Sequence, residues 1–305
     1  MRKYTEKLWG SFRTKEGGAL TFMDMKNPKN KVLYWTLFAL MVLIALICLL
    51  PPLWILISSF KSAKELLQVP PKLFPENWDL TKFKELWSHL KFGQYYRNTI
   101  IIAIGSVFFS VLCNGLAGYV LSCLKPAAAS LYATLILWTM LLPSTLSTVA
   151  IFKNVIDFPI FGWNLSNTYW PLWFIHGANA FQILLYKNYF DDISKSLVEA
   201  ARLDGCNRVK IFSKIILPLS KSIVAVDAIF TVNGVWGEFL MPYLTLNDPS
   251  KKTVMMAIYD MSGGTTYSLD QQMAGIVFAI LPPVIIFFFL QKYIMGGINI
   301  GGVKE

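Results

Sequence analysis

The sequence predicts an all-α integral membrane protein with six transmembrane helices. Of its 305 residues, 55% are hydrophobic and only 15% are charged, and the mean hydropathy is +0.49. A soluble protein carries nearer to about 25% charged residues. The apolar residues are also gathered into long blocks rather than spread around one aqueous core. We therefore expect lipid to surround much of the chain.

The apolar blocks have the length that a membrane helix needs. A bilayer core of about 30 Å is crossed by roughly 20 apolar helical residues. Blocks of this kind occupy residues 32–57, 98–124, 131–152, 168–190, 223–246 and 272–295. The first block is too long for a signal peptide, and its end at Pro51 and Pro52 lacks a small-residue cleavage site, so we expect it to remain as an anchor. The second, third and fourth blocks hold Gly, Asn and Pro, which packed membrane helices tolerate.

The remaining segments suggest one membrane domain with polar ends. We expect residues 1–31 to form a cytoplasmic N-terminal arm, residues 32–295 the six-helix domain, and residues 296–305 a cytoplasmic C-terminal tail. The segment 58–97 is rich in proline and predicts an irregular outer loop with a short helix near 81–90. No internal repeat of twenty to fifty residues is present.

Charge indicates the orientation. The net charge is +10, but no basic stripe with interleaved aromatic residues is present, so we expect no nucleic-acid partner. Lys and Arg concentrate on the cytoplasmic side of membrane proteins. With both termini inside, 18 of the 28 Lys and Arg residues fall in cytoplasmic segments. The outer loop 58–97 is itself basic and argues for the inverse, but the N-terminal cluster flanks the first span and outweighs it.

The sequence lacks the patterns of enzymes and metal sites. The phosphate-binding pattern GxxxxGK[ST] is absent, as are GxGxxG, HExxH and GxSxG, and there are only two histidines. We therefore expect no catalytic residue, no metal site and no cofactor bound by this chain. The four cysteines, which show no CxxC spacing, are expected to be buried thiols without a disulfide framework. They are Cys48, Cys113, Cys123 and Cys206.

An informative polar loop, about 191–221, lies between the fourth and fifth blocks. Residues 194–203 are strong helix formers, with Ile193, Leu197, Ala200 and Ala201 spaced along one predicted face. Gly205 follows, where a helix end favours a residue that can adopt positive φ. A second amphipathic run, 209–217, ends at Pro218. The loop predicts a helix, a sharp turn and a second helix on the cytoplasmic surface.

The motif EAARLDG at 199–205, followed by Leu217 and Pro218, resembles the EAA-type motif of binding-protein-dependent ABC importer permeases. Further matches are Asn98–Thr99, Ala117–Gly118–Tyr119, Leu142–Pro143, Asn167–Thr168, VWGEFLMP at 235–242, LPP at 281–283 and QKYIMGGINIGGVKE at 291–305. Together they are similar to the maltose-type sugar permease subfamily, in particular its smaller six-span subunit, over roughly 32–305. The chain departs from that pattern at Cys206, at Gly237, where the family often has Asn, and at Glu305.

The resemblance implies a type I ABC importer permease with a cytoplasmic coupling helix between spans four and five. The coupling helix would dock into the ATPase through Glu199, Ala200, Ala201, Arg202, Leu203, Asp204 and Gly205. The C-terminal tail would contribute Gly301, Gly302, Val303 and Lys304. The implied partners are a second related permease, two copies of an ATPase that uses ATP and Mg²⁺, an extracytoplasmic solute-binding protein, a carbohydrate and membrane lipid. The implied location is a prokaryotic plasma membrane. An intrahelical pair between Glu199 and Arg202 is the alternative role for that glutamate.

Polar groups inside the apolar blocks are candidates for a solute pathway, since they are expensive there. His176, Asn179 and Gln182 share one face of the predicted fourth span, and Trp236 lies beside Glu238 in the fifth. Gly234, Gly237 and Pro242 predict a kinked or broken helix around Glu238. The alternatives are interhelical hydrogen bonds for the first three and an outer-interface carboxylate for Glu238. Asp227 is expected to reach cytoplasmic water, towards Lys221.

Three other functions are alternatives, and two of them are disfavoured by the sequence. The chain resembles permeases that import carbohydrate, and the same architecture could import another small polar solute. An ion-gradient-driven secondary transporter is disfavoured, because six spans without an internal repeat make half of a typical fold and no acid or histidine relay is present. A membrane enzyme is disfavoured because Asp191 and Asp192 form the sole acidic doublet, without metal-ligand spacing.

Overall fold

The computed structural model describes residues 28–263 and 266–296. These residues are mostly helical, and no β-strand occurs among them beyond one isolated bridge between Phe158 and Trp163. The chain divides into two compact units, residues 1–57 and residues 58–305. The all-α prediction is therefore confirmed for the described part of the chain.

The first unit contains helix α2 (Pro28–Ser58). The helix is apolar from Val32 to Ile57 except for Thr36, and its first turn carries Lys29, Asn30 and Lys31. A helix that is hydrophobic on all sides suits a membrane span better than the surface of a soluble domain. Pro51 and Pro52 lie within the helix without ending it. This helix is the predicted first span.

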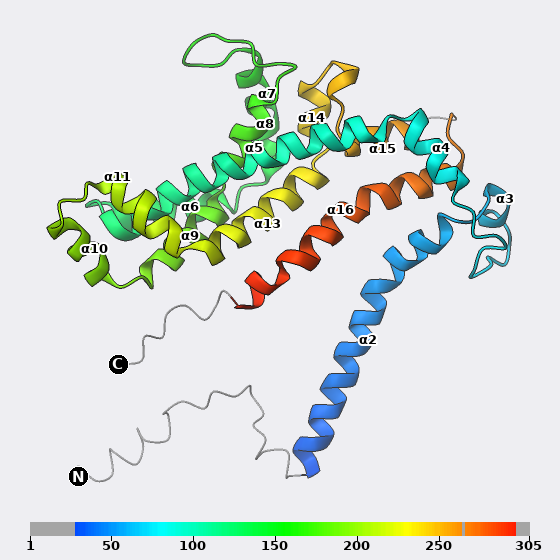
Figure 1. Ribbon diagram of the computed structural model, residues 1–305, viewed down its shortest axis with the longest axis horizontal. Helices are drawn as coiled ribbons and strands as arrows, with labels where there is room; N and C mark the ends of the chain where they lie inside the picture. Colours follow the sequence, from blue (N-terminus) through cyan, green and yellow to red (C-terminus); the bar gives the residue numbers. More distant parts are fainter. Residues whose placement is uncertain (1–27, 264–265, 297–305) are drawn as a thin grey trace. The chain divides into compact units, whose positions relative to one another are not determined.

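The second unit is built around three helices that lie side by side (Figure 1). They are α5 (Phe92–Tyr119), which continues as the π-helical turn η3 (Val120–Leu124), α13 (Lys221–Gly237) and α16 (Leu269–Gly296). Helix α13 runs antiparallel to the other two. Trp236 at its end donates a 2.9 Å hydrogen bond from Nε1 to the Ala279 carbonyl, and Tyr96 near the start of α5 donates to Phe278.

The six predicted spans are not all single helices in the described part of the chain. Within the described residues, three helices are long and apolar enough to cross a bilayer, namely α2, α5 with η3, and Leu269–Gln291 of α16. The predicted third, fourth and fifth spans are each divided. The pieces are α6 (Ala129–Thr139), η4 (Ser144–Ser147) and α7 (Thr148–Ile156); α8 (Trp170–Gly177) and α9 (Ala180–Asp191); and α13 and α14 (Leu240–Thr245). The number of membrane crossings stays a prediction.

The two ends of the second unit carry different short elements (Figure 1). Near the start of α5 lie α3 (Ala63–Leu66), α4 (Thr81–His89), η6 (Pro249–Lys251) and α15 (Val254–Ser262). The predicted helix near 81–90 is thus confirmed. At the opposite end lie α10 (Lys195–Leu203), α11 (Arg208–Ile211), η5 (Phe212–Ile216) and α12 (Leu217–Leu219).

The second helix of the 191–221 loop is longer than expected. It runs from Arg208 to Leu219 and does not end at Pro218. Pro218 lies one residue before the end of this helix, in the short α12 that directly follows the π-helical turn η5. The chain then bends by 82° into α13.

All four cysteines are free. The expected burial is wrong for Cys48 and Cys113, which are exposed, whereas Cys123 and Cys206 are partly buried. Exposure of an apolar thiol carries little cost in a membrane helix, since lipid rather than water is the expected surrounding.

Candidate functional site

Helix α10 carries the EAA-type motif on an exposed face. Ala201 is buried, with 5% of its surface accessible. The other six residues of the motif 199–205 are exposed, and Leu203 is 89% accessible. The motif is therefore presented outwards by a helix that is anchored on its other side.

The anchored side differs from the sequence prediction. Val198, Ala201 and Ile193 pack on a core cluster that includes Tyr186 and Phe190. Leu197 and Ala200, which were expected on the buried face, are exposed instead. The reason is that α10 contacts the body of the protein along a narrow stripe, so a helix with several apolar residues can turn only some of them inwards.

The turn after α10 takes the shape that the glycine permits. Gly205 has φ of +76°, in the left-handed region that residues with a Cβ seldom adopt. Its N–H donates to the Arg202 carbonyl at 3.0 Å, and the Cys206 N–H donates to the Ala201 carbonyl at 3.0 Å. Asn207 then caps α11 by accepting from the Lys210 N–H at 2.8 Å. The predicted positive φ at Gly205 is confirmed.

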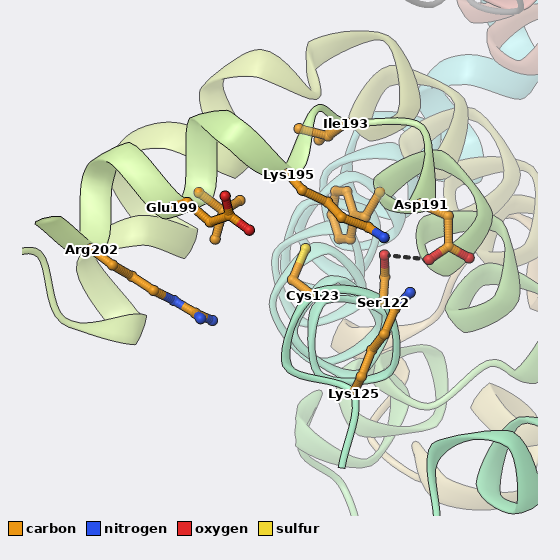
Figure 2. Close-up of a pocket in the computed structure, with 10 residues that line it drawn as sticks. Ser122, Cys123, Lys125, Asp191, Ile193, Lys195, Glu199 and Arg202 are labelled. Atoms are coloured by element: carbon orange, nitrogen blue, oxygen red, sulfur yellow. Dashed lines mark hydrogen bonds between the residues drawn. The ribbon is translucent and has the colours of Figure 1, made fainter. Parts of the chain in front are cut away.

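A cavity of about 240 Å³ lies behind α10 (Figure 2). Its walls come from the end of α5 and η3, the end of α9, and α10 itself. The lining residues are Ser122, Cys123, Lys125, Phe190, Asp191, Ile193, Lys195, Val198, Glu199 and Arg202. The cavity thus joins the motif to the ends of two apolar helices.

The charges around this cavity are only partly paired. Asp191, just beyond the predicted fourth span, accepts hydrogen bonds from Ser122 Oγ at 2.8 Å and from Lys187 Nζ at 2.7 Å. Burial opposes ionisation of Asp191, but these two bonds outweigh it and lower the pKa below its ordinary value. In the described structure, no salt bridge joins Glu199 to Arg202, so the intrahelical pair is not formed. The Glu199 carboxylate is available to a partner.

The three polar residues of the predicted fourth span do not share one helical face. The helix is broken, because α8 ends at Gly177 and α9 begins at Ala180. Asn179 caps α9 by accepting from the Gln182 N–H at 3.1 Å. The His176 ring lies against α13, since a Cβ on Gly234 would be 3.5 Å from its Cε1. Gln182 is buried and turned into the helix bundle.

Gln182 belongs to a buried polar cluster that the sequence reasoning missed. Its Nε2 donates to Thr231 Oγ1 at 2.9 Å, and its Oε1 lies 3.1 Å from Asn114 Nδ2 and 3.3 Å from Ser110 Oγ. Interhelical hydrogen bonding, the alternative left open for Gln182, is what the contacts favour. These residues come from α5, α9 and α13, so no short sequence pattern could have grouped them.

The expectation that Asp227 reaches water is wrong. Its side chain is fully buried on α13. One carboxylate oxygen accepts from Ser110 Oγ at 2.9 Å and the other from Tyr186 OH at 3.2 Å. The physical reason is that α13 packs against both α5 and α9 at this level, so hydroxyl groups replace water around the carboxylate.

Trp236 and Glu238 lie at the expected break in the fifth span. Helix α13 ends at Gly237, with Glu238 as its C-cap, so the broken helix is confirmed. Trp236 is 3% exposed and bonded to Ala279. Glu238 is half-buried and accepts from the Met241 N–H at 3.0 Å, which caps the start of α14. Both side chains therefore have structural contacts, and a role in solute passage stays a prediction.

A second cavity, of about 710 Å³, lies at two helix breaks. Its lining comes from the break between α6 and α7 and from the break between α8 and α9. The lining residues are Thr139, Met140, Leu142, Pro143, Leu146, Ser147, Ala178, Asn179, Ala180 and Phe181. Of the predicted pathway residues, Asn179 is the one that lines it. Broken helices around a cavity are a common form of transporter binding site.

Two further sets of expectations concern residues outside this site. The tail residues Gly301, Gly302, Val303 and Lys304 lie outside the described part of the chain. Among the described residues, no three His, Cys, Asp or Glu side chains gather closely enough to hold a metal ion.

Comparisons with known proteins agree with these features. Residues 125–299 match the family model described as binding-protein-dependent transport system inner membrane component. The chain is 28% identical over 283 residues to the arabinooligosaccharides transport system permease protein AraQ of Halalkalibacterium halodurans, covering 92% of this chain and 100% of that protein. It is 30% identical over 234 residues to the maltodextrin transport system permease protein MdxG of Bacillus subtilis, covering 76% and 82%.

A solved structure has the same fold. A chain in the crystal structure of a bacterial ABC transporter involved in the import of the acidic polysaccharide alginate matches with a TM-score of 0.75. The match covers 88% of this chain and 98% of that chain, at 23% identity.

Proposed function

This chain belongs to the family of binding-protein-dependent transport system inner membrane components and is an ABC transporter permease subunit; we propose that it imports a carbohydrate, a di- or oligosaccharide delivered by an extracytoplasmic binding protein. The relatives named for maltodextrin and arabinooligosaccharides support this substrate class. In the proposed assembly, this chain pairs with a second permease and with two ATPase subunits. Six spans would place both termini in the cytoplasm.

The observation that carries the proposal is the exposed face of α10. The motif residues Glu199 and Arg202 are exposed, line the 240 Å³ cavity and form no salt bridge within the described part of the chain, and the buried Ala201 packs the helix on the body of the protein. Such a helix can transmit a movement of the ATPase to the membrane domain, because it is attached at one end of the two long helices α5 and α13. ATP and Mg²⁺ would be used by the ATPase subunits, since this chain has no phosphate-binding loop.

In this proposal, the solute would pass along the side of the helix bundle that contains the α6–α7 and α8–α9 breaks. The cavity there is lined by the polar side chains of Asn179, Thr139 and Ser147 together with apolar side chains. A hydroxyl-rich solute needs a few such groups to replace its hydration. The other predicted pathway residues, His176, Gln182, Trp236 and Glu238, are not among the residues that line this cavity, and their place along the pathway stays a prediction.

Uptake by the reconstituted complex tests the proposal. The permease, co-purified with its partners in proteoliposomes, is offered labelled maltotriose, arabinotriose, diacetylchitobiose and raffinose together with the binding protein. We expect at least one of these oligosaccharides to accumulate when ATP is supplied on the side of the membrane that carries the ATPase subunits. Accumulation driven by an ion gradient without ATP would establish a secondary transporter. ATP-driven uptake of a different polar solute alone would correct the substrate class.

A further inference from the structure

The break between α8 and α9 leaves backbone groups that must find partners elsewhere. A helix end has N–H and C=O groups without helical partners, and those groups that face the helix bundle instead of the cavity cannot be satisfied by water. The break consists of Ala178 and Asn179, between the end of α8 at Gly177 and the start of α9 at Ala180. The groups at issue are the His176 carbonyl, on the last turn of α8, and the Asn179 N–H, just before α9.

The side chain of Asn114, on α5, meets both groups. Its Oδ1 accepts from the Asn179 N–H at 2.9 Å, and its Nδ2 lies 3.3 Å from the His176 carbonyl oxygen. Only an amide offers an acceptor and a donor side by side at this spacing. Asn114 therefore stands in for two of the helical hydrogen bonds that the break removes.

Asn114 is itself held from several directions. It is fully buried, and its Nδ2 also lies 2.9 Å from Ser110 Oγ and 3.1 Å from Gln182 Oε1. Ser110 is tied to α13 through Asp227 at 2.9 Å, and Gln182 is tied to α13 through Thr231 at 2.9 Å. The amide is thus part of a network that spans α5, α9 and α13, which leaves it little freedom to turn.

The break that Asn114 holds is the rim of the 710 Å³ cavity. Ala178, Asn179, Ala180 and Phe181 line that cavity from the α8–α9 side. We propose that Asn114 is a positioning residue for transport: it fixes the shape of the Ala178–Asn179 rim, against which solute passes, without contacting solute itself. This inference rests on the proposed function.

Asn98 offers a matched control. It lies on the same helix, is 1% exposed, and donates from Nδ2 to the backbone carbonyls of Ser250 at 2.8 Å and Lys252 at 2.9 Å. It thus also bonds backbone groups, in a segment that does not line the cavity. Asn114→Leu and Asn98→Leu each remove a buried asparagine amide that bonds backbone, so Asn98→Leu shows what such a loss does away from the cavity.

The rim is tested by thiol labelling and by transport in the reconstituted complex. In a background without native cysteines, the rate at which Ala178→Cys reacts with the small anionic reagent MTSES reports how accessible the rim is. We expect Asn114→Leu to change this labelling rate several-fold. The same variant should raise the KM for the imported oligosaccharide about tenfold, with a smaller change in kcat. A factor of ten corresponds to about 1.4 kcal/mol of contact energy. Asn98→Leu should change neither.

The possible results separate this inference from the proposed function. Equal KM values and labelling rates in the two variants would make Asn114 a packing group and overturn the inference alone. Absence of ATP-driven uptake by the wild-type complex would overturn the proposed function, and the inference with it. If Asn114→Leu does not assemble, Asn114→Ser provides the same comparison, because its hydroxyl is too short to reach both backbone groups.

Discussion

At the scale of single residues, Glu65 shows how this chain holds a carboxylate with neutral donors. Glu65 lies in α3, within the predicted outer loop, and is 8% exposed. The N–H groups of Ser62 and Glu76 donate to it at 2.6 and 2.7 Å, and the Ser62 hydroxyl donates at 2.7 Å. These bonds, in that order of importance, lower the pKa of Glu65 to about 2. The charged form therefore stabilises the fold of the loop.

The lowered pKa predicts how stability depends on pH. The contribution of Glu65 is fully present above its ordinary pKa of 4.5 and is lost as the pH falls towards about 2. We expect Glu65→Gln to lower the Tm at pH 7 by a few degrees, for a loss of roughly 1–2 kcal/mol. The difference from wild type should shrink at pH 3. Thermal unfolding in detergent measures it, with the exposed Glu85→Gln as control, and a gap that does not depend on pH would contradict the account.

Some residues could be predicted from the sequence and others could not. The positive φ of Gly205 follows from its place directly after a helix, which is local information. The surroundings of Asp227 are not local, because its partners Ser110 and Tyr186 lie 117 and 41 residues away. The exposed face of α10 could be predicted only in part. Helical spacing identifies the apolar residues of the helix, but it does not show which of them pack against the rest of the protein.

At the scale of elements, α5 and α9 approach closely at Gly118. A Cβ on Gly118 would lie 2.6 Å from Tyr186 Cβ and 2.9 Å from the Lys187 backbone nitrogen. Real Cβ atoms do not come this near, so the two helices would have to separate. Gly115, one turn earlier on α5, has no such contact, because its Cβ would be 3.6 Å from the nearest atom, Phe212 Cζ.

This difference predicts unequal effects of two alanine substitutions. Gly118→Ala should destabilise the α5–α9 packing by roughly 1–3 kcal/mol, the usual cost of overpacking. Gly115→Ala should be neutral or slightly stabilising, because alanine is the better helix former. Thermal unfolding of the two purified variants provides the comparison. Equal Tm values would show that α5 and α9 are not packed as closely as the Gly118 contacts indicate.

The helix breaks were predictable where the sequence marks them. Pro143 lies at the break between α6 and α7, and Gly237 ends α13. The break after Gly177 has a weaker mark, since His176, Asn179 and Gln182 fit a continuous helix equally well. What stabilises this break is Asn114, from a different helix, and such tertiary contacts override local propensity.

At the scale of the whole molecule, the short elements at the two ends of α5 are expected on opposite sides of the membrane. The α10 end carries the motif proposed to meet the ATPase, so it should be cytoplasmic. Asn247 lies near the other end and, like Ser194, is exposed. The assignment of the α10 end to the cytoplasmic side, and of the opposite end to the outer side, does not depend on the exact number of spans.

Orientation is measured by labelling single cysteines on intact cells. In a cysteine-free background, Asn247→Cys should react with a thiol reagent that cannot cross the membrane, and Ser194→Cys should react only after the cells are opened. Each position controls for the other, because both are exposed loop sites. The reverse pattern would invert the proposed topology and remove α10 from the side on which ATP is available.

The central claim, that α10 couples this chain to an ATPase, is tested most directly by Glu199→Ala with Asp192→Ala as control. Both carboxylates are exposed and lie close in sequence, but only Glu199 belongs to the motif. Loss of one charge-assisted hydrogen bond costs roughly 1.5–3 kcal/mol, which is about a tenfold or larger loss in docking. In the reconstituted complex, Glu199→Ala should therefore lower solute-stimulated ATP hydrolysis and uptake about tenfold, more than it lowers subunit association, while Asp192→Ala retains both. Wild-type hydrolysis and uptake with Glu199→Ala would contradict the claim.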